Sequence, residues 1–287
     1  MKLHKYSEKE ILSRLDSEAP ADALWIFDCD GTLVTGDVAS HTAWGLIRAG
    51  IAARDQLPDD FETRFRRDPF DFEAFDLLRT FIASRGGNSV YEWEALLQSG
   101  HTPEAIHKVA KEIIDIGLGL HTLQWTEPVS TIARRHADRA WIVSGSPQVC
   151  VQVIGEKLNI PKERTLASLL EVKDGLYTRN FLPPGIVWEG LKRLILEEKG
   201  IYRPWFVAGD SIGDWAMMEM AVGWRWCILW GEHRHRGVEM RGIVQERVLK
   251  DAALLPEEPG IYVFSDEGKN WILEVKSKPE RPDRVTK

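Results

Sequence analysis

The chain has 287 residues, of which 44% are hydrophobic and 28% charged, as expected for a globular protein with room for a core domain and an insert. Its net charge of −7 offers no basic excess for nucleic acid as the main partner. No stretch approaches the roughly 20 apolar residues that span a bilayer, and the N-terminus lacks the apolar segment of a signal peptide. Cys29, Cys150 and Cys227 show no metal-ligand spacing. We therefore expect a reduced, cytoplasmic protein without a membrane partner.

The first predicted strand ends in two aspartates. Residues 24–27 form a consecutive apolar run, which is typical of a strand buried on both faces of a parallel sheet, and Asp28 and Asp30 follow it. Two carboxylates at the carboxyl end of a strand repel each other unless a cation lies between them, and oxygen ligands suit Mg²⁺. The alternative is a capped strand end in which Asp30 and Gly31 form a simple turn.

Residues 37–124 have a different character. They contain no clear buried-strand run, but helical periodicity recurs in residues 43–53, 70–84, 90–98 and 103–116. Thr102-Pro103-Glu104 is typical of a helix start. We therefore predict an all-helical cap domain inserted after the first strand of the core. The Asp- and Arg-rich residues 59–71 fit a solvated loop better than a substrate-facing one.

Strands and helices alternate after this insert. Strand runs occupy residues 141–143, 205–208 and 226–230, and helical patterns occupy residues 149–158 and 187–199. This rhythm predicts a doubly wound, Rossmann-like α/β core made of residues 1–36 and 125–230.

Two of these strands also end in polar residues. The first is followed by Ser144-Gly145-Ser146-Pro147, whose hydroxyl and N–H groups could bind an anion, although the string fits any turn. The second ends in Gly209-Asp210, with Asp214 one helical turn later. That spacing is equally typical of a helix capped by an acid.

Residues 231–287 are predicted to form a C-terminal extension. Apolar runs at 261–264 and 271–275 flank the polar turn 266–268, which predicts a β-hairpin. The last dozen residues are charged and contain proline, which predicts a frayed tail.

Together, the three strand-end motifs resemble those of the haloacid dehalogenase superfamily, most closely its phosphoserine-phosphatase-like branch. The DxDGT motif is matched by Asp28 to Thr32, the second motif by Ser144-Gly145, and the fourth by Gly209-Asp210 with Asp214. Residues 146–175 are also similar to this branch. The resemblance spans residues 22–230, and the helical cap of the branch follows the first motif, where the predicted insert begins.

The resemblance implies a phosphatase in which Asp28 attacks phosphorus and forms an aspartyl-phosphate, while Asp30 acts as general acid and base. It implies that the carboxylates of Asp28 and Asp210 and the backbone carbonyl of Asp30 hold Mg²⁺, and that Asp214 positions metal-bound waters. Phosphate esters are favoured over carbon–halogen bonds because dehalogenases of the superfamily lack the second aspartate.

The resemblance also suggests a class of substrate. Ser144 and the Gly145 N–H would hold phosphate oxygens of a small phosphorylated metabolite. Asp37 lies where phosphoserine phosphatases carry a glutamate that binds the substrate ammonium, so an amine-bearing substrate such as phosphoserine is one candidate and a first-turn helix acid is the alternative. The cap aromatics fit a cap core better than a cation-π wall. These aromatics are Trp44, Phe70, Phe72 and Phe75.

The chain departs from the family pattern at the motif-three lysine. Aligning residues 184–189 with that segment places apolar residues where the lysine belongs. Lys192 and Arg193 come later on the same predicted helix, about 10 Å further along for position 193. Either cation could reach the site, or a lysine from elsewhere could replace the missing one, but the interpretation that we favour is that both are solvated. A catalytically impaired protein that binds a phosphorylated ligand as a sensor or partner module, and a phosphotransferase, therefore stay open as alternatives.

Overall fold

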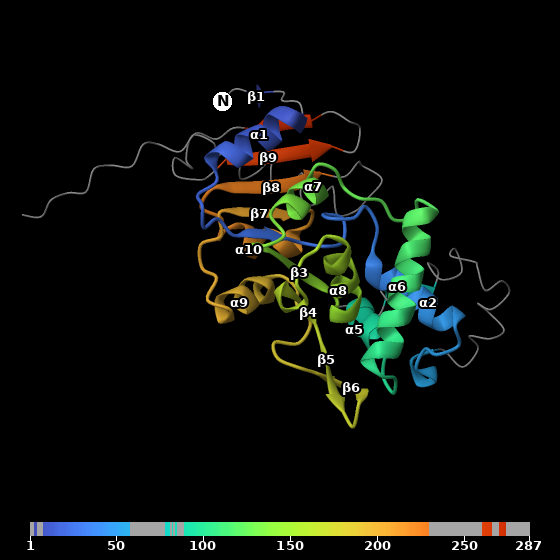
Figure 1. Cartoon of the computed structure of the whole chain (residues 1–287). Helices are drawn as coiled ribbons and strands as arrows, with labels where there is room; N and C mark the ends of the chain where they lie inside the picture. The colour runs from blue at the N-terminus through green and yellow to red at the C-terminus, as the bar shows by residue number, and fades with distance from the viewer. Residues whose placement is uncertain are drawn as a thin grey trace, which may run out of the picture.

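The computed structural model of this chain is an α/β protein with one large sheet (Figure 1). The structure describes residues 3–4, 8–57, 78–80, 82, 84, 89–229, 260–265 and 270–273. The strands of the large sheet are β1 (Leu3–His4), β2 (Trp25–Phe27), β3 (Ala140–Pro147), β4 (Thr165–Ser168), β7 (Phe206–Gly209), β8 (Trp224–Leu229), β9 (Gly260–Ser265) and β10 (Asn270–Leu273). A second sheet contains β5 (Leu170–Lys173) and β6 (Leu176–Phe181).

The α-helices are α1 (Glu8–Glu18), α2 (Val38–Arg48), α5 (Ser89–Leu96), α6 (Pro103–Gly119), α7 (Val129–Arg135), α8 (Gln148–Lys157), α9 (Gly190–Glu198) and α10 (Trp215–Met218). Three short 3₁₀ turns, Arg54–Gln56, Lys162–Arg164 and Ile212–Asp214, complete the helical elements in the described ranges. None of the described helices is long and apolar enough to cross a membrane.

The order of the large sheet is β1-β10-β9-β8-β7-β2-β3-β4. From β4 to β9 each strand runs parallel to its neighbour, whereas β10 and β1 are antiparallel at one edge. Parallel strands require crossover connections, and helices lie in the described connections between β2 and β3, β3 and β4, β4 and β7, and β7 and β8. The predicted doubly wound α/β core is confirmed.

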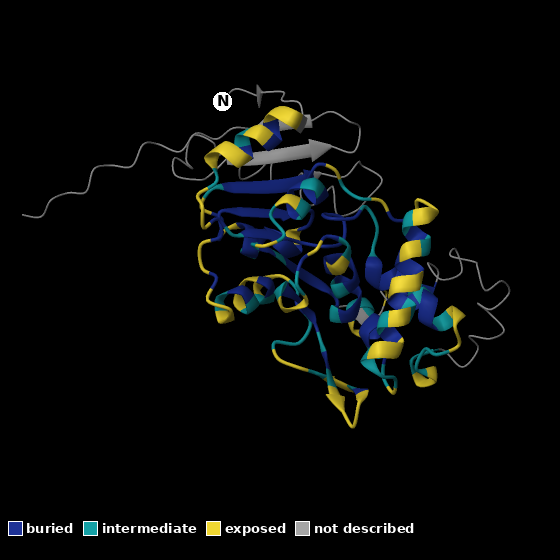
Figure 2. Cartoon of the chain, viewed as in Figure 1, coloured by how far each residue is buried: buried dark blue, intermediate teal, exposed yellow. Residues whose placement is uncertain are grey.

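The core lies on both faces of this sheet (Figure 2). Trp25 and Phe27 of β2 belong to a buried cluster that also contains residues of α1, α7 and α8. Ile26, between them, belongs to a second cluster with Leu196 of α9 and Met217 of α10. Because side chains alternate along a strand, a strand covered on both faces must be apolar at consecutive positions. This explains the uninterrupted apolar runs in the sequence.

In the segment for which a C-terminal hairpin was predicted, β9 pairs with β10 in the antiparallel direction, and the predicted turn lies outside the described residues. β9 also pairs in parallel with β8: Gly260 is the partner of Trp224 at one end, and Ser265 is the partner of Leu229 at the other. The hairpin therefore extends the core sheet. The predicted tail lies beyond the described ranges.

Helices α2, α5 and α6 occupy the predicted insert and lie together at one side of the sheet (Figure 1). Thr102 caps α6 by accepting a hydrogen bond from the Ala105 N–H, and Pro103 is its first residue, as predicted. Buried residues of α6, including Ile106 and Ala110, belong to the same hydrophobic cluster as α8. The division of residues 37–124 into a separate cap domain stays a prediction.

The aromatic residues expected in the cap are only partly described. Trp44 packs against the hydrophobic cluster, and the Arg48 guanidinium lies 5.4 Å from the centroid of its ring. Its position agrees with the interpretation as core. Phe70, Phe72 and Phe75, together with the Asp- and Arg-rich residues 59–71, lie outside the described residues.

Candidate active site

Three neighbouring parallel strands, β2, β3 and β7, end at the same edge of the sheet. Phe27, the last residue of β2, pairs with residues of both β3 and β7. Asp28, which follows it, therefore lies beside the ends of the strands that carry Ser144 and Asp210. The parallel register is the reason that polar residues remote from one another in sequence meet.

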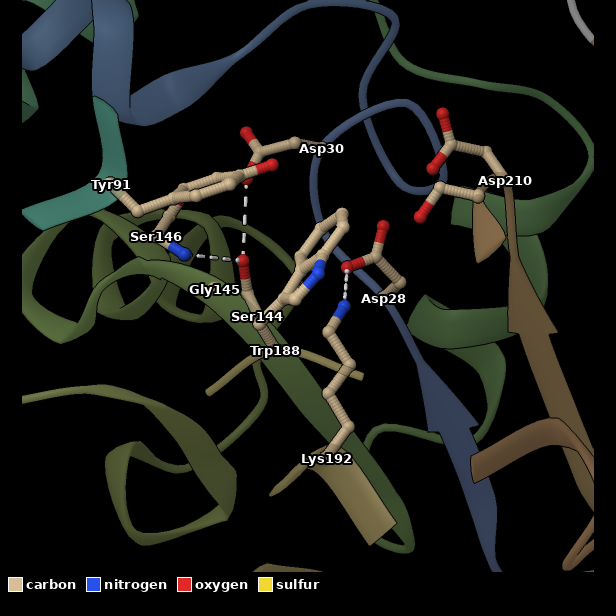
Figure 3. Close-up of a pocket in the computed structure, with 10 residues that line it drawn as sticks. Asp28, Asp30, Tyr91, Ser144, Gly145, Ser146, Trp188, Lys192 and Asp210 are labelled. Atoms are coloured by element: carbon tan, nitrogen blue, oxygen red, sulfur yellow. Dashed lines mark hydrogen bonds and ion pairs between the residues drawn. The ribbon is translucent and has the colours of Figure 1, made fainter. Parts of the chain in front are cut away.

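A small pocket lies over these strand ends (Figure 3). It is lined by Asp28, Asp30, Tyr91, Ser144, Gly145, Ser146, Trp188, Lys192, Asp210 and Ser211. Five of the seven predicted site residues thus share one pocket. The other two, Asp37 and Asp214, do not line it.

Lys192 reaches into the site, contrary to the expectation that it is solvated. Its side chain is 2% exposed, and its Nζ lies 2.6 Å from Asp28 Oδ1 and 2.6 Å from Asp214 Oδ1. The expectation was wrong because helix α9 begins at Gly190, three residues later than predicted, which puts Lys192 in its first turn. Arg193 is exposed and pairs with Glu197, as expected.

Asp214 holds the loop that carries Asp210. Its Oδ2 accepts hydrogen bonds from the backbone N–H of Asp210 at 3.0 Å, and from the backbone N–H and hydroxyl of Ser211, each at 2.9 Å. Its Oδ1 accepts from Lys192. Both oxygens are therefore used in positioning the loop and the lysine.

Asp30 is held by three donors. Its Oδ1 accepts from the Val38 N–H at the start of α2, at 2.6 Å, and its Oδ2 accepts from the hydroxyls of Ser146 at 2.6 Å and Ser144 at 3.3 Å. Ser144 Oγ in turn accepts from the Ser146 N–H at 3.1 Å. Ser146 was not among the predicted site residues, although it lies in the string that follows the strand.

The electrostatics of the site follow from its burial. Burial and the charge of Asp214 raise the pKa of Asp28, and Lys192 offsets part of this rise. Burial, with the charges of Asp37 and Asp28, raises the pKa of Asp30 above its usual range. Burial lowers the pKa of Lys192, but the charges of Asp214 and Asp28 outweigh burial and raise the pKa overall. A cation in the site would stabilise the ionised carboxylates.

The donor set fits a hard divalent cation. Oxygens of Asp28, Asp210 and Asp214 lie within 4.8 Å of one another, and all three residues are buried. Carboxylate oxygens are the ligands that Mg²⁺ prefers. Gly31 makes this approach possible, because a Cβ there would lie 2.0 Å from Asp210 Oδ2, and its φ of +81° also suits glycine. Since Asp214 is engaged by Lys192 and the loop, Asp28 and Asp210 are the carboxylates best placed to bind the ion.

Asp37 has a different environment from the one that an ammonium site requires. It is the N-cap of α2, where Oδ1 accepts from the Ser40 N–H at 3.0 Å, and its Oδ2 lies 2.5 Å from Arg79 Nη2. Arg79 also pairs with Glu94, at 3.1 Å. The carboxylate of Asp37 is thus engaged by a helix terminus and a guanidinium, which favours the interpretation as a helix-capping acid.

Two aromatic residues of the pocket were not predicted for the site. Tyr91 comes from α5, and Trp188 lies just before α9. Their ring centroids are 5.2 Å apart with an interplanar angle of 33°. No sequence pattern links residues that are so far apart along the chain, so only the fold could reveal the pair.

Comparisons with known proteins agree with this fold. The family described as haloacid dehalogenase-like hydrolase matches residues 25–219. No curated protein matches the chain. A structure of a protein of unknown function from Bordetella pertussis Tohama I is 19% identical, with a TM-score of 0.57, over 78% of this chain and 95% of that chain.

Two further solved structures are similar. A conserved functionally unknown protein from Anaerococcus prevotii DSM 20548 is 14% identical, with a TM-score of 0.57, over 86% of this chain and 91% of that chain. A structure described as a phospho-aspartyl intermediate analogue of phosphoserine phosphatase is 22% identical, with a TM-score of 0.38, over 73% of this chain and 87% of that chain. The two structures with a TM-score of 0.57 show the fold.

Proposed function

Because the chain belongs to the haloacid dehalogenase-like hydrolase family, we propose that it is a Mg²⁺-dependent phosphatase that hydrolyses a small phosphorylated metabolite through an aspartyl-phosphate on Asp28. The observation that carries this proposal is the buried ion pair of Lys192 with Asp28, beside Asp30 and Asp210 in one pocket. A lysine there neutralises part of the charge of the nucleophile and of the incoming phosphate.

Asp28 is the nucleophile in this proposal. Its carboxylate lies at the end of β2 with one oxygen held by Lys192, which orients the group toward the pocket. Attack on phosphorus forms the bond from the carboxylate oxygen and releases the leaving alcohol, so that one difficult displacement becomes two easier ones. Mg²⁺ bound by Asp28, Asp210 and the backbone carbonyl of Asp30 would supply electrostatic stabilisation of the phosphoryl group.

Asp30 is the general acid and base. Burial raises its pKa, which favours the protonated form that donates a proton to the leaving oxygen. After that transfer the ionised carboxylate can accept a proton from the water that hydrolyses the aspartyl-phosphate. Ser144 and the N–H of Gly145 line the same pocket and would hold phosphate oxygens.

The position of Lys192 also weakens the alternative of a catalytically impaired binding protein. That alternative was motivated by the extra C-terminal hairpin, which could mediate association, and by the lysine missing from residues 184–189. Lys192 supplies a buried ammonium at the carboxylate of Asp28, so this reason for expecting impaired catalysis no longer applies.

Release of inorganic phosphate from an aryl phosphate, measured with Mg²⁺ and with EDTA, tests the proposal. We expect metal-dependent release that Asp28→Asn abolishes, because the amide cannot form the aspartyl-phosphate. Asp138→Asn is the matched control, because the Asp138 side chain is 71% exposed. Full activity in the Asp28→Asn protein would require another nucleophile.

A further inference from the structure

The rings of Tyr91 and Trp188 lie directly beside the residues of the proposed chemistry. Both are half-buried, and both line the pocket that contains Asp28, Asp30 and Lys192 (Figure 3). Their position places two aromatic rings in the wall of the proposed substrate pocket.

The rings lie close to the backbone at Gly213 and Gly145, and at Gly213 only a glycine leaves room for the indole of Trp188. A Cβ at Gly213 would lie 2.7 Å from Cη2 of Trp188, so the indole packs directly on the backbone of the loop that carries Asp210. A Cβ at Gly145 would lie 3.7 Å from Cε3 of Trp188 and 3.7 Å from Cδ1 of Tyr91. Both rings therefore lie over the backbone that would hold the phosphate.

Among the described residues that line the pocket, every charged side chain already has a role in the proposed function. The lining carboxylates are Asp28, Asp30 and Asp210, which the proposed function assigns to phosphoryl transfer and metal binding. Asp37 is engaged by Arg79 and by the start of α2. The aromatic rings of Tyr91 and Trp188 are the large uncharged surfaces among the described lining residues.

We propose that Tyr91 and Trp188 form an aromatic wall that selects phosphomonoesters whose leaving group is a flat aromatic ring. This inference rests on the proposed function, because it concerns the substrate of the same pocket. The two rings already contact each other at a centroid distance of 5.2 Å, so the substrate ring stacks on the pocket side of the wall rather than between its members.

The affinities of two non-hydrolysable phosphonates test the aromatic wall without any need for catalysis. Benzylphosphonate and cyclohexylmethylphosphonate carry the same charge and differ in the flat, aromatic character of the ring. We expect the wild-type protein with Mg²⁺ to bind the benzyl compound about 3- to 10-fold more tightly by titration calorimetry, the range that one aromatic pair supplies. Equal affinities, or no binding of either compound, would overturn the inference.

Variants of Trp188 test whether the aromatic wall causes the tighter binding of benzylphosphonate. Trp188→Leu should bring the ratio of the two dissociation constants to within about twofold of one, and Trp188→Phe should retain part of it, since a smaller ring still stacks. Tyr202→Leu is the matched control, because Tyr202 is 64% exposed and does not line the pocket; its ratio should equal that of the wild type. A wild-type ratio in Trp188→Leu would contradict the proposal.

Two outcomes separate this inference from the proposed function. If Trp188→Leu does not fold, as judged by circular dichroism, the Tyr91→Phe and Tyr91→Leu pair replaces it, with the larger loss of preference expected for leucine. Phosphate release from both phenyl phosphate and cyclohexyl phosphate without any preference in phosphonate affinity overturns only the aromatic wall. A clear phosphonate preference without Mg²⁺-dependent phosphate release overturns only the hydrolysis.

Discussion

Lys192 Nζ lies 2.6 Å from Asp28 Oδ1, although the two residues are 164 positions apart in the chain. The same ammonium lies 2.6 Å from Asp214 Oδ1. One buried cation thus connects the proposed nucleophile to the residue that holds the Asp210 loop. The charge balance of the nucleophile and the position of the loop therefore depend on the same side chain.

Replacing Lys192 with methionine removes the charge while keeping a similar length. Two buried carboxylates then lose their cation, which we expect to lower the free energy of unfolding by about 3–5 kcal/mol and kcat by at least about 100-fold. Urea denaturation and phosphate release measure the two effects. Arg193→Met is the control on the same helix, since its exposed pair with Glu197 contributes at most about 1 kcal/mol. Wild-type kcat in Lys192→Met would contradict the role of the lysine.

Asp214→Asn should weaken metal binding although Asp214 need not touch the ion. In Asp214 one oxygen accepts a hydrogen bond from Lys192 and the other accepts hydrogen bonds from residues 210 and 211. Asparagine has only one such oxygen, so its NH₂ group, which is itself a donor, must face one of these two sets of donors. We expect a loss of about 2–3 kcal/mol in stability and a smaller rise in melting temperature on addition of Mg²⁺.

Ser211→Ala provides the graded comparison for this prediction. It removes only the hydroxyl donor to Asp214 and should cost about 1 kcal/mol. The order of stability should be wild type, Ser211→Ala, then Asp214→Asn. An Asp214→Asn protein with the same Mg²⁺-induced thermal shift as the wild type would show that the loop does not depend on this carboxylate.

Gly31→Ala should abolish the Mg²⁺-induced thermal shift. The added Cβ would lie 2.0 Å from Asp210 Oδ2, so the carboxylate of Asp210 must leave its present position. Gly50→Ala is a close control, because Gly50 also has a positive φ, of +70°, but a Cβ there would meet nothing within 4 Å beyond its chain neighbours. That control should lose only about 1 kcal/mol of stability and retain the shift. Equal shifts in both variants would contradict the prediction.

Glu94 should make stability depend on pH. Burial, together with the charge of Asp37, raises the pKa of Glu94 to about 8, and Arg79 and Ser40 offset part of this rise. Between about pH 5 and pH 8 the folded protein therefore retains a proton that the unfolded chain releases, and this group lowers stability as the pH rises.

Glu94→Gln removes this titration. The free energy of unfolding of the variant, relative to wild type, should increase between about pH 5 and pH 8 in urea denaturation experiments. Glu92→Gln is the control, because Glu92 is an exposed residue of the same helix. A difference between Glu94→Gln and wild type that does not change with pH would rule out a raised pKa for Glu94.

The strands of the core and five residues that line the pocket could be predicted, because the sequence patterns that indicate them extend over only a few neighbouring positions. A strand buried on both faces must be apolar at consecutive positions, and its carboxyl end can be located from the polar residues that follow, as Asp28, Ser144 and Asp210 do. Parallel neighbours end at one edge, so these residues meet without any further information.

Lys192 and the aromatic wall could not be predicted in the same way. The start of α9 at Gly190 decides whether Lys192 faces the pocket, and helix ends are set by tertiary contacts and a few backbone angles, such as the positive φ of 49° at Glu189. Tyr91 and Trp188 meet only because α5 packs near the end of β3.

The sequence by itself determined the α/β core and the acidic strand ends, because apolar periodicity and turn residues act over a few neighbouring positions. Only the tertiary structure decided which cation faces Asp28, which carboxylates remain for a metal, and which rings surround the pocket. Those relationships depend on side-chain directions and distances between segments that are remote in the chain, and no local pattern encodes them.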